Sequence, residues 1–203
     1  MPVSPWRNIG LVVEAIVAVN PRSALDIGVG NGKWGYLVRE YIDIWQGRYA
    51  RQQWEVRIDG IEVWEPYIHD YQRAIYDQIF IGRAQDVVPT LSGCYDLVLA
   101  CDVIEHLAKQ EALRLIAQLQ ARADKLLLLS IPVGPGWLRK SYNENPYEAH
   151  LSEWRAEEFR ALGACWINVS KIQNNRNDTA LVCFPGSEWQ RALPPVLWGY
   201  QVV

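Results

Sequence analysis

The sequence predicts an α/β protein built on a doubly wound, mostly parallel sheet of seven strands that ends in an antiparallel hairpin. Short apolar runs alternate along the chain with stretches of helical period. Two of these runs, 95–101 and 126–131, are almost continuously apolar, as expected for central parallel strands covered on both faces. Strands that alternate with helices are typical of a parallel sheet with helices on both sides.

The first half of the chain is expected to supply three strands. Asn20-Pro21 ends the first helix, and proline at position 66 suits the first turn of a later one. The expected elements of this half are a helix over 8–19, a strand over 23–27, a helix from Lys33, a polar loop over 47–53, a strand over 56–63, a helix from Pro66 with Ile68, Tyr71 and Ile75 inward, and a strand over 79–81.

The second half is expected to supply four strands and a long loop. Residues 133–150 are rich in Gly, Pro, Asn and Tyr and have no clear period, so they are expected to form a loop. Ser152 is expected to cap a helix that runs to about 162, with Glu153 in its first turn. The other expected elements are a strand over 95–101, a helix with Ala112, Leu115, Ile116, Leu119 and Ala123 inward, a strand over 126–131, and a hairpin of 165–172 and 179–184 turned by 174–178.

Length and composition favour one compact domain over 1–203, with its core at about 8–184, a long loop at 133–150 and a C-terminal tail at 185–203. The chain has 203 residues, half of them hydrophobic, which is enough to bury a stable core. The formal charge is −3 and no dense Lys/Arg cluster occurs, so there is no strong nucleic-acid signature. A homo-oligomer is compatible with the sequence.

Several features point to a cytoplasmic protein without a membrane span. Its four cysteines are widely spaced without a C-x-x-C pair, which is typical of buried thiols in a reducing compartment. The first residues do not form a signal peptide, and the longest apolar stretches are too short to span a bilayer. Ten Trp residues stand against three Phe. Most are expected in core packing, and Trp137, in a loop, is the candidate for an aromatic-lined ligand pocket.

A glycine-rich turn follows the first expected strand. Residues 26–35 read Asp-Ile-Gly-Val-Gly-Asn-Gly-Lys-Trp-Gly. Glycine tolerates positive φ and leaves no Cβ in the way, so the backbone and the helix N-terminus can approach a nucleotide-like ligand. Residues 30–35 also match the dinucleotide pattern G-x-G-x-x-G. The register disfavours a dinucleotide, because Asp26 and Gly28 already occupy the strand end. An acid there suits an ammonium and a sulfonium and would repel a pyrophosphate.

The run 26–32 resembles the first motif, acid-x-Gly-x-Gly-x-Gly, of the class I S-adenosylmethionine-dependent methyltransferases. Residues 102–107, Asp-Val-Ile-Glu-His-Leu, resemble a run found in many small-molecule members of that family. The resemblance covers about 8–184. It implies a Rossmann-like methyltransferase fold, methyltransferase activity and S-adenosyl-L-methionine as the cofactor.

The resemblance also implies which residues bind the methionine and ribose parts of the cofactor. Asp26 would support the turn and the ammonium, and the backbone around Cys101 would also meet the ammonium. Glu62, followed by Val63, would accept both ribose hydroxyls in charge-assisted hydrogen bonds. Glu62 lies 36 positions after Asp26, whereas an analogous spacing is about 20. We attribute the excess to an insertion near 47–54; otherwise Glu65 is the next candidate. The methionine part would lie against Gly28, Gly30, Asn31 and Gly32.

The segment 82–87 resembles the part of the family that reads adenine. Asp86 would accept a hydrogen bond from the exocyclic amine, and the Val87 N–H would donate one to the ring. The family usually has an acid directly after the glycine, and Arg83 replaces it here.

Two histidines are the candidates for catalysis. An acceptor hydroxyl needs a general base, and His150 or His106 fits that role because histidine titrates near neutrality. His150 lies in the expected acceptor loop, where it could instead bond to the backbone near the next helix. No metal is expected; the alternative is a site of Asp102, Glu105 and His106, because positions i, i+3 and i+4 share a helical face. Similar runs occur in ubiquinone-pathway O-methyltransferases and in small-RNA 2′-O-methyltransferases.

These observations predict a methyltransferase that moves a methyl group to an oxygen or nitrogen of a small or sugar-like acceptor. Two alternatives stay open. One is a non-catalytic cofactor-binding module that regulates or scaffolds a partner, and the other, disfavoured by the register of Asp26, is an NAD-dependent oxidoreductase.

Overall fold

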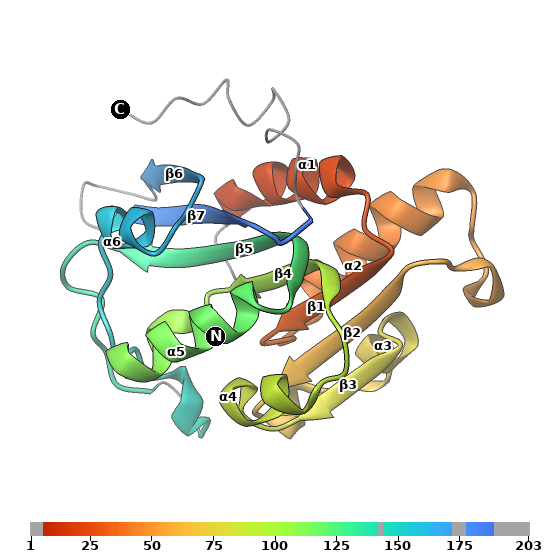
Figure 1. Cartoon of the computed structure of the whole chain (residues 1–203). Coiled ribbons are helices and arrows are strands. Elements are labelled where there is room, and N and C mark those ends of the chain that lie inside the picture. The colour runs from red at the N-terminus through yellow and green to blue at the C-terminus, as the bar shows by residue number, and fades with distance from the viewer. Residues whose placement is uncertain (1–5, 142–143, 172–177, 189–203) are drawn as a thin grey trace.

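The structure of the chain is a computed structural model, which describes residues 6–141, 144–171 and 178–188. Within these residues one sheet has the strand order β3-β2-β1-β4-β5-β7-β6 (Figure 1). The strands are β1 Ser23–Ile27, β2 Arg57–Glu62, β3 Gln78–Ile81, β4 Tyr95–Cys101, β5 Ala123–Val133, β6 Trp166–Lys171 and β7 Asp178–Pro185. The first five strands pair in parallel, and β7 pairs antiparallel with both β5 and β6. The predicted fold class is therefore confirmed.

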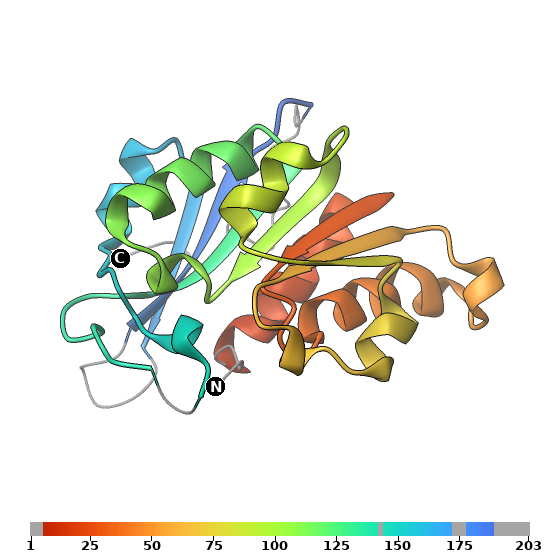
Figure 2. The ribbon, with the colours of Figure 1, turned by 90° about the horizontal axis from the view of Figure 1, so that it is seen from below.

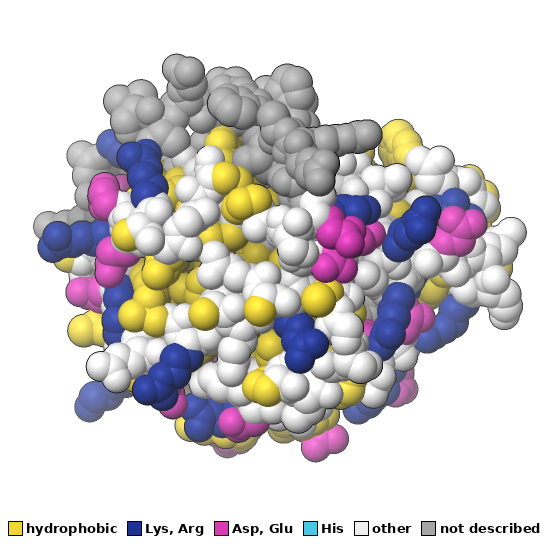
Figure 3. All heavy atoms as spheres, viewed as in Figure 1, with side chains coloured by type: hydrophobic (Ala, Val, Ile, Leu, Met, Phe, Trp, Pro, Cys, Tyr) yellow, Lys and Arg dark blue, Asp and Glu magenta, His cyan; other side chains and the backbone are white. Residues whose placement is uncertain are grey.

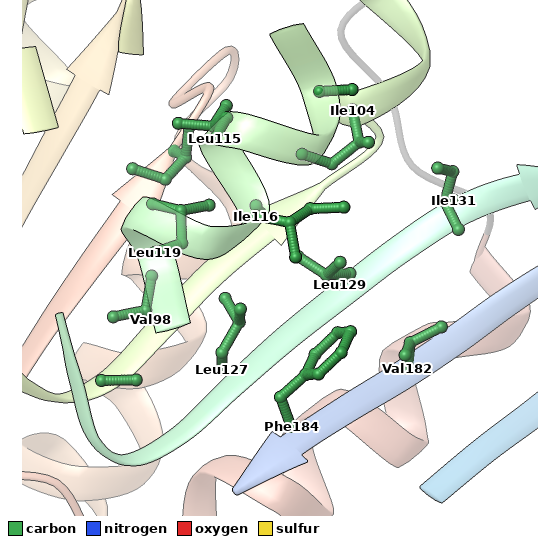
Figure 4. Packing of buried hydrophobic residues seen from close by; sticks show 14 of the residues in the cluster. Val98, Ile104, Leu115, Ile116, Leu119, Leu127, Leu129, Ile131, Val182 and Phe184 are labelled. Atoms are coloured by element: carbon green, nitrogen blue, oxygen red, sulfur yellow. The ribbon is translucent and has the colours of Figure 1, made fainter. Parts of the chain in front are cut away.

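Helices cover both faces of the sheet (Figure 2). Their bounds are α1 Ile9–Val19, α2 Lys33–Val38, α3 Asp70–Ile75, α4 Ala84–Val87, α5 Lys109–Gln120 and α6 Ala156–Ala161. Successive strand residues point to opposite faces, so alternate residues join two separate cores. In β4, for example, Val98 and Ala100 pack with α5 and α6, while Leu97 and Leu99 pack with α1 and α2. Figure 4 shows the core on the α5 side of the sheet, where Leu115, Ile116 and Leu119 of α5 lie over β4, β5 and β7.

The segment between α2 and β2 accounts for the long spacing between Asp26 and Glu62. The helix does not end at Val38 but continues as a π-helical turn, Arg39–Asp43, and a 3₁₀ turn, Ile44–Gln46. Arg39 is 1% exposed and holds this extension by donating to the Asp43 carboxylate at 2.5 Å and to the Val56 carbonyl at 2.6 Å. A buried guanidinium needs such partners, so the added residues form a fixed structure that leads back into β2.

Four local expectations are wrong. Tyr71 is 51% exposed and does not face inward, because Pro66 opens only the 3₁₀ turn Glu65–Tyr67 and α3 begins later, at Asp70. Ala123 belongs to β5 rather than to the preceding helix. Ser152 does not cap α6, which begins at Ala156; its hydroxyl accepts a hydrogen bond from the indole N–H of Trp154 instead. Glu153 accordingly lies outside the first helical turn.

Some expectations fall beyond the part of the chain that the structure describes. Ile172, the turn at 174–177 and the tail from 189 to 203 lie outside it. On the face shown in Figure 3, basic and acidic side chains are intermixed. No helix formed by the described residues has the length and apolar character needed to cross a membrane.

Candidate active site

A cleft of about 860 Å³ opens at the carboxyl ends of the parallel strands. It lies where the strand order reverses between β1 and β4, the place where open α/β sheets bind their ligands. Its volume is in the range of small-molecule sites. The lining residues from the strand ends and the turns that follow them are Ile27, Gly28, Val29, Gly30, Asn31, Lys33, Ile61, Glu62, Val63, Gly82, Arg83, Ala84, Gln85, Cys101, Asp102, Val103, Glu105 and His106.

The glycine turn after β1 needs glycine for steric reasons. Gly28, Gly30 and Gly32 all have positive φ, at 76°, 49° and 73°. A Cβ on Gly28 would lie 2.6 Å from the Cγ2 of Val103, in the turn after β4. Gly28, Gly30 and Asn31 line the cleft, whereas Gly32 lies behind it, against Gln72 of α3. Gly28, Gly30 and Asn31 therefore lie where the sequence predicts, whereas Gly32, which was expected against the methionine part of the cofactor, faces α3 and not the cleft.

Glu62 is fixed to the glycine turn by a direct hydrogen bond. The Gly30 N–H donates to one carboxylate oxygen at 2.9 Å, and the Trp64 N–H donates to the other at 2.8 Å. Burial raises the pKa of Glu62, and these two hydrogen bonds oppose the rise. Glu62 and Val63 line the cleft, while Glu65 is exposed and does not. Each carboxylate oxygen has a second lone pair that a ligand hydroxyl can use, so Glu62 can accept two further hydrogen bonds from the cleft.

Asp26 lies behind the turn and does not line the cleft. Its carboxylate accepts a hydrogen bond from the Tyr76 hydroxyl at 2.5 Å, and that hydroxyl also accepts from the Gly35 N–H at 3.1 Å. Burial raises the pKa of Asp26 to about 7, although the Tyr76 hydrogen bond opposes this. The geometry fits support of the turn and gives no contact with the cleft.

The segment 82–87, which the sequence assigns to adenine binding, differs from that expectation. Asp86 is exposed, and neither it nor Val87 lines the cleft; Gln85 does. The reason is the helical phase of α4, which begins at Ala84. Successive residues of a helix are rotated by about 100°, so when Gln85 faces the cleft Asp86 points toward solvent. The side-chain amide nitrogen of Gln85 is buried and has no hydrogen-bond partner within the described structure. It is a donor available to a ligand.

The turn after β4 carries the second sequence motif. Cys101 is buried at the strand end and lines the cleft, and burial raises its pKa well above the usual range. Asp102 adopts a left-handed conformation with φ 56°, which aspartate tolerates better than most residues. Lys33 faces the same region: burial lowers its pKa, and the charge of Asp102 opposes that shift.

The two residues that follow the loop over 133–150 are joined to the motif after β4 by backbone hydrogen bonds. Leu151 and Ser152 N–H groups both donate to the Glu105 carbonyl, at 2.8 and 3.1 Å. Arg139 and His150 form an isolated antiparallel bridge across the loop. Glu153 accepts from the Trp137 N–H at 2.9 Å and so takes part in the loop rather than in α6. These contacts place the loop over the second half of the cleft.

His106 and His150 meet in this second half. Their rings are 4.8 Å apart in an edge-to-face arrangement, and the ring of Trp137 stacks on His150 at 6.1 Å. All three residues line the cleft; that this part of the cleft holds the acceptor stays a prediction. Burial lowers the pKa of His106, and burial together with the charges of His106 and Arg139 lowers the pKa of His150 to about 4. Both rings are therefore neutral at physiological pH.

The three potential metal ligands differ from the predicted set. Glu105, His106 and His150 bring one ligand atom each to within 4.8 Å of one another, and Asp102 is not part of this group. The expectation of Asp102, Glu105 and His106 assumed an α-helical face. Asp102 instead has left-handed backbone, and a 3₁₀ turn covers only Ile104–His106.

Several cleft residues were not singled out from the sequence. Glu148 accepts from the Tyr67 hydroxyl at 2.9 Å, which joins the loop to the segment after β2. Arg139 lines the same cleft as the two histidines. In the sequence, the only indication that Glu148 and Arg139 line a site is their position in a polar loop without periodicity. Such a position does not identify single residues. Trp6 and Arg7 line the cleft from before α1, and nothing in the sequence connects them with it.

No family model matches the chain, and no curated protein is similar to it in sequence. Solved structures are similar in fold. An O-methyltransferase family protein from Burkholderia thailandensis is 13% identical over 90% of this chain and 57% of that one, with a TM-score of 0.53. Magnesium protoporphyrin IX methyltransferase (ChlM) from Synechocystis PCC 6803 with bound SAM is 16% identical over 88% and 78%, with a TM-score of 0.56. N-methyltransferase NodS from Bradyrhizobium japonicum WM9 is 12% identical over 89% and 94%, with a TM-score of 0.58.

The chain spans little more than half of the first of these proteins and most of the other two. It has the fold of the class I S-adenosylmethionine-dependent methyltransferases.

Proposed function

We propose that the protein is an S-adenosylmethionine-dependent methyltransferase that acts on an oxygen or nitrogen of a small or sugar-like acceptor. One observation carries the proposal: Glu62 at the end of β2 is hydrogen-bonded to Gly30 of the glycine turn, and both face one cleft at the strand-order reversal. The glycine turn lets the backbone lie close to the methionine part of the cofactor, and the Glu62 carboxylate accepts hydrogen bonds from its ribose. The SAM-bound structure of ChlM, a protein of the same fold, supports the choice of cofactor.

In this proposal the two parts of the cleft divide the ligands. The cofactor lies along the glycine turn, with Glu62 on its ribose and the Cys101 backbone near its ammonium. The Gln85 amide takes the position at the adenine that the sequence assigned to Asp86. The acceptor lies under the loop, between Trp137 and the two histidines.

Methyl transfer itself requires no covalent bond between the protein and the methyl group. The acceptor atom forms a bond to the methyl carbon while the carbon–sulfur bond breaks, and its electron pair stays on sulfur, which leaves a neutral thioether. Because the sulfonium is a good leaving group, the main task is to align the acceptor and the methyl group in a site without water.

An acceptor hydroxyl also has to lose its proton. His106 is the better general base of the pair, because its Nδ1 lies 3.0 Å from the Ala149 carbonyl. An N–H at Nδ1 donating to that carbonyl leaves Nε2 free to accept a proton. His150, with a pKa of about 4, is a weaker base and suits an orienting role as a hydrogen-bond acceptor.

Titration of the purified protein with S-adenosylhomocysteine in a calorimeter tests the cofactor assignment. One binding site per chain is expected, with a rise in melting temperature; no heat and no stabilisation would end the proposal. NADH serves as the comparison ligand and is expected not to bind. A screen of acceptor pools for cofactor turnover then separates an enzyme from a cofactor-binding module, which would bind S-adenosylhomocysteine without turning over S-adenosylmethionine.

A further inference from the structure

We propose that Glu105, His106 and His150 form a site for a divalent first-row transition-metal ion in the acceptor half of the cleft, and that the acceptor binds this ion through an oxygen. The ion site stands on the geometry of the three side chains. The role of the ion in methyl transfer rests on the function proposed above. It narrows the substrates of the proposed enzyme to acceptors with a hydroxyl that binds a metal ion.

The three side chains come from two separate parts of the chain. Glu105 and His106 lie in the 3₁₀ turn after β4, and His150 lies in the loop that is hydrogen-bonded to the carbonyl of Glu105. Their potential ligand atoms lie within 4.8 Å of one another. Ligand atoms about 2.1 Å from one ion in a tetrahedral arrangement are roughly 3.4 Å apart. Each of the three atoms would therefore move by less than about 1 Å to reach coordination.

The unsatisfied atoms of this group point to a missing partner. Glu105 is 1% exposed and His150 is 5% exposed. One carboxylate oxygen of Glu105 and Nδ1 of His150 are buried with no hydrogen-bond partner in the parts of the chain that the structure describes. Unpartnered buried polar groups cost free energy, and two of them in one three-residue cluster are best explained by a ligand that both can bind.

The environment of His106 is the one expected of a metal ligand. Its Nδ1 is within hydrogen-bond distance of the Ala149 carbonyl, at 3.0 Å. Metal-binding histidines usually donate their second ring N–H to a carbonyl or carboxylate, which fixes the tautomer and the ring orientation. The lone pair of Nε2 is then available to the ion.

The donor set selects the type of ion. Two imidazoles and one carboxylate suit zinc, manganese, iron or cobalt, whereas magnesium and calcium prefer oxygen ligands. Three protein ligands also leave coordination positions open, which is typical of catalytic rather than structural sites. The open positions face the cleft that all three residues line.

A bound ion would activate the acceptor in place of a histidine base. Coordination lowers the pKa of a hydroxyl, so the acceptor loses its proton to water and keeps its oxygen on the metal. That oxygen then forms the bond to the methyl carbon as the carbon–sulfur bond breaks. A histidine nitrogen that holds the ion cannot also accept the proton, so this arrangement and the general-base role of His106 exclude each other.

Titration of the metal-stripped full-length protein with cobalt(II) tests the site, because the visible absorption spectrum of bound cobalt(II) depends on its ligands. We expect one ion per chain. His150→Gln and Glu105→Gln are expected to weaken the affinity at least about tenfold. The matched control is His69→Ala, which removes the third histidine of the chain, an exposed residue beside α3; it is expected to leave the affinity and the spectrum unchanged. S-adenosylhomocysteine binding, measured on each variant, checks that the cofactor half is folded.

Absence of one-to-one binding by the wild type would overturn the proposal. So would binding that persists in both His150→Gln and Glu105→Gln, or that disappears in His69→Ala. If S-adenosylhomocysteine binds without metal but cobalt does not bind, the metal site alone is wrong. If cobalt binds at these residues but S-adenosylhomocysteine does not, the proposed function is wrong and the ion site remains.

Discussion

The two halves of the cleft are built in different ways. The cofactor half consists of strand ends and the turns after them, and its carboxylates are held by hydrogen bonds: Glu62 accepts from Gly30 and Trp64, and Asp26 accepts from Tyr76. The buried amide nitrogen of Gln85 is the exception that lines the cleft, since it has no partner among the described residues. The acceptor half is closed by a loop without sequence period, and it contains buried atoms of Glu105 and His150 that have no hydrogen-bond partner in the described structure.

The difference shows in which half the main carboxylate is already fixed without a ligand. In the cofactor half two backbone hydrogen bonds hold Glu62 in place, so a ligand hydroxyl meets a preorganised acceptor. In the acceptor half the polar atoms lack such partners and their burial costs free energy until a ligand binds them. We therefore expect changes in the acceptor half to affect turnover, and changes in the cofactor half to affect binding or stability.

The largest effect is expected from the histidines. His106→Ala and His150→Ala should lower the rate of methyl transfer about 10²- to 10⁴-fold, because activation of the acceptor is lost. Their affinity for S-adenosylhomocysteine should stay within about twofold, since neither ring contributes to the cofactor half. Steady-state kinetics with an acceptor from the pool screen, beside calorimetry, measures both quantities. Equal loss of turnover and of cofactor affinity would contradict the division of the cleft into two halves, and unchanged turnover would show that neither histidine activates the acceptor.

Asp26 is expected to make stability depend on pH. Burial raises its pKa to about 7 in the folded protein, from 3.8 as the ordinary value. The folded carboxyl thus keeps its proton where the unfolded one has lost it. Its contribution to stability is fully present below about pH 4 and is lost as the pH rises to about 7.

Asp26→Asn removes this dependence. Relative to the wild type, the free energy of unfolding of the variant should increase between pH 4 and 7, by on the order of 3 kcal/mol, and then level off. Urea unfolding at unit pH steps measures the difference. Parallel stability curves for the two proteins would show that Asp26 is not held protonated behind the turn.

Glu62→Gln tests the ribose carboxylate. The amide keeps one acceptor oxygen and turns an NH₂ group toward a backbone N–H, so the affinity for S-adenosylhomocysteine should fall about 10- to 100-fold. The matched control is Glu65→Gln, at the alternative position, which is exposed and should leave the affinity unchanged. The reverse result would move the ribose site to Glu65.

The smallest effect is expected at the adenine end. Gln85→Ala removes a buried amide donor and should weaken S-adenosylhomocysteine binding about fivefold, as for one hydrogen bond of about 1 kcal/mol. Asp86→Ala should change it less than twofold, because that side chain is exposed. A larger loss for Asp86→Ala would show that α4 rotates when the cofactor binds.

The sequence was sufficient where a local pattern determines the structure. The bounds predicted for β1 and β4 agree with the structure, because each is an apolar run that ends in a turn. The glycine turn was predictable for the same reason, since positive φ at alternate positions requires glycine. The choice of Glu62 came from its place in the order of strand ends.

The sequence was not sufficient where the position of a side chain depends on the phase of a helix or on contacts between distant parts of the chain. One residue of helical phase separates Gln85, in the cleft, from Asp86, outside it. The contact of His150 with Glu105 and His106 depends on the path of an aperiodic loop, and no periodicity encodes that path. The same loop takes Ser152 and Glu153 away from the helix start at which their residue types were expected.

A crystal structure with S-adenosylhomocysteine bound tests the central claim most directly. The account predicts the ligand in the cleft between the ends of β1 and β4, with both ribose hydroxyls within hydrogen-bond distance of the Glu62 carboxylate. A ligand bound elsewhere, or an empty cleft with Glu62 still held only by Gly30 and Trp64, would contradict it.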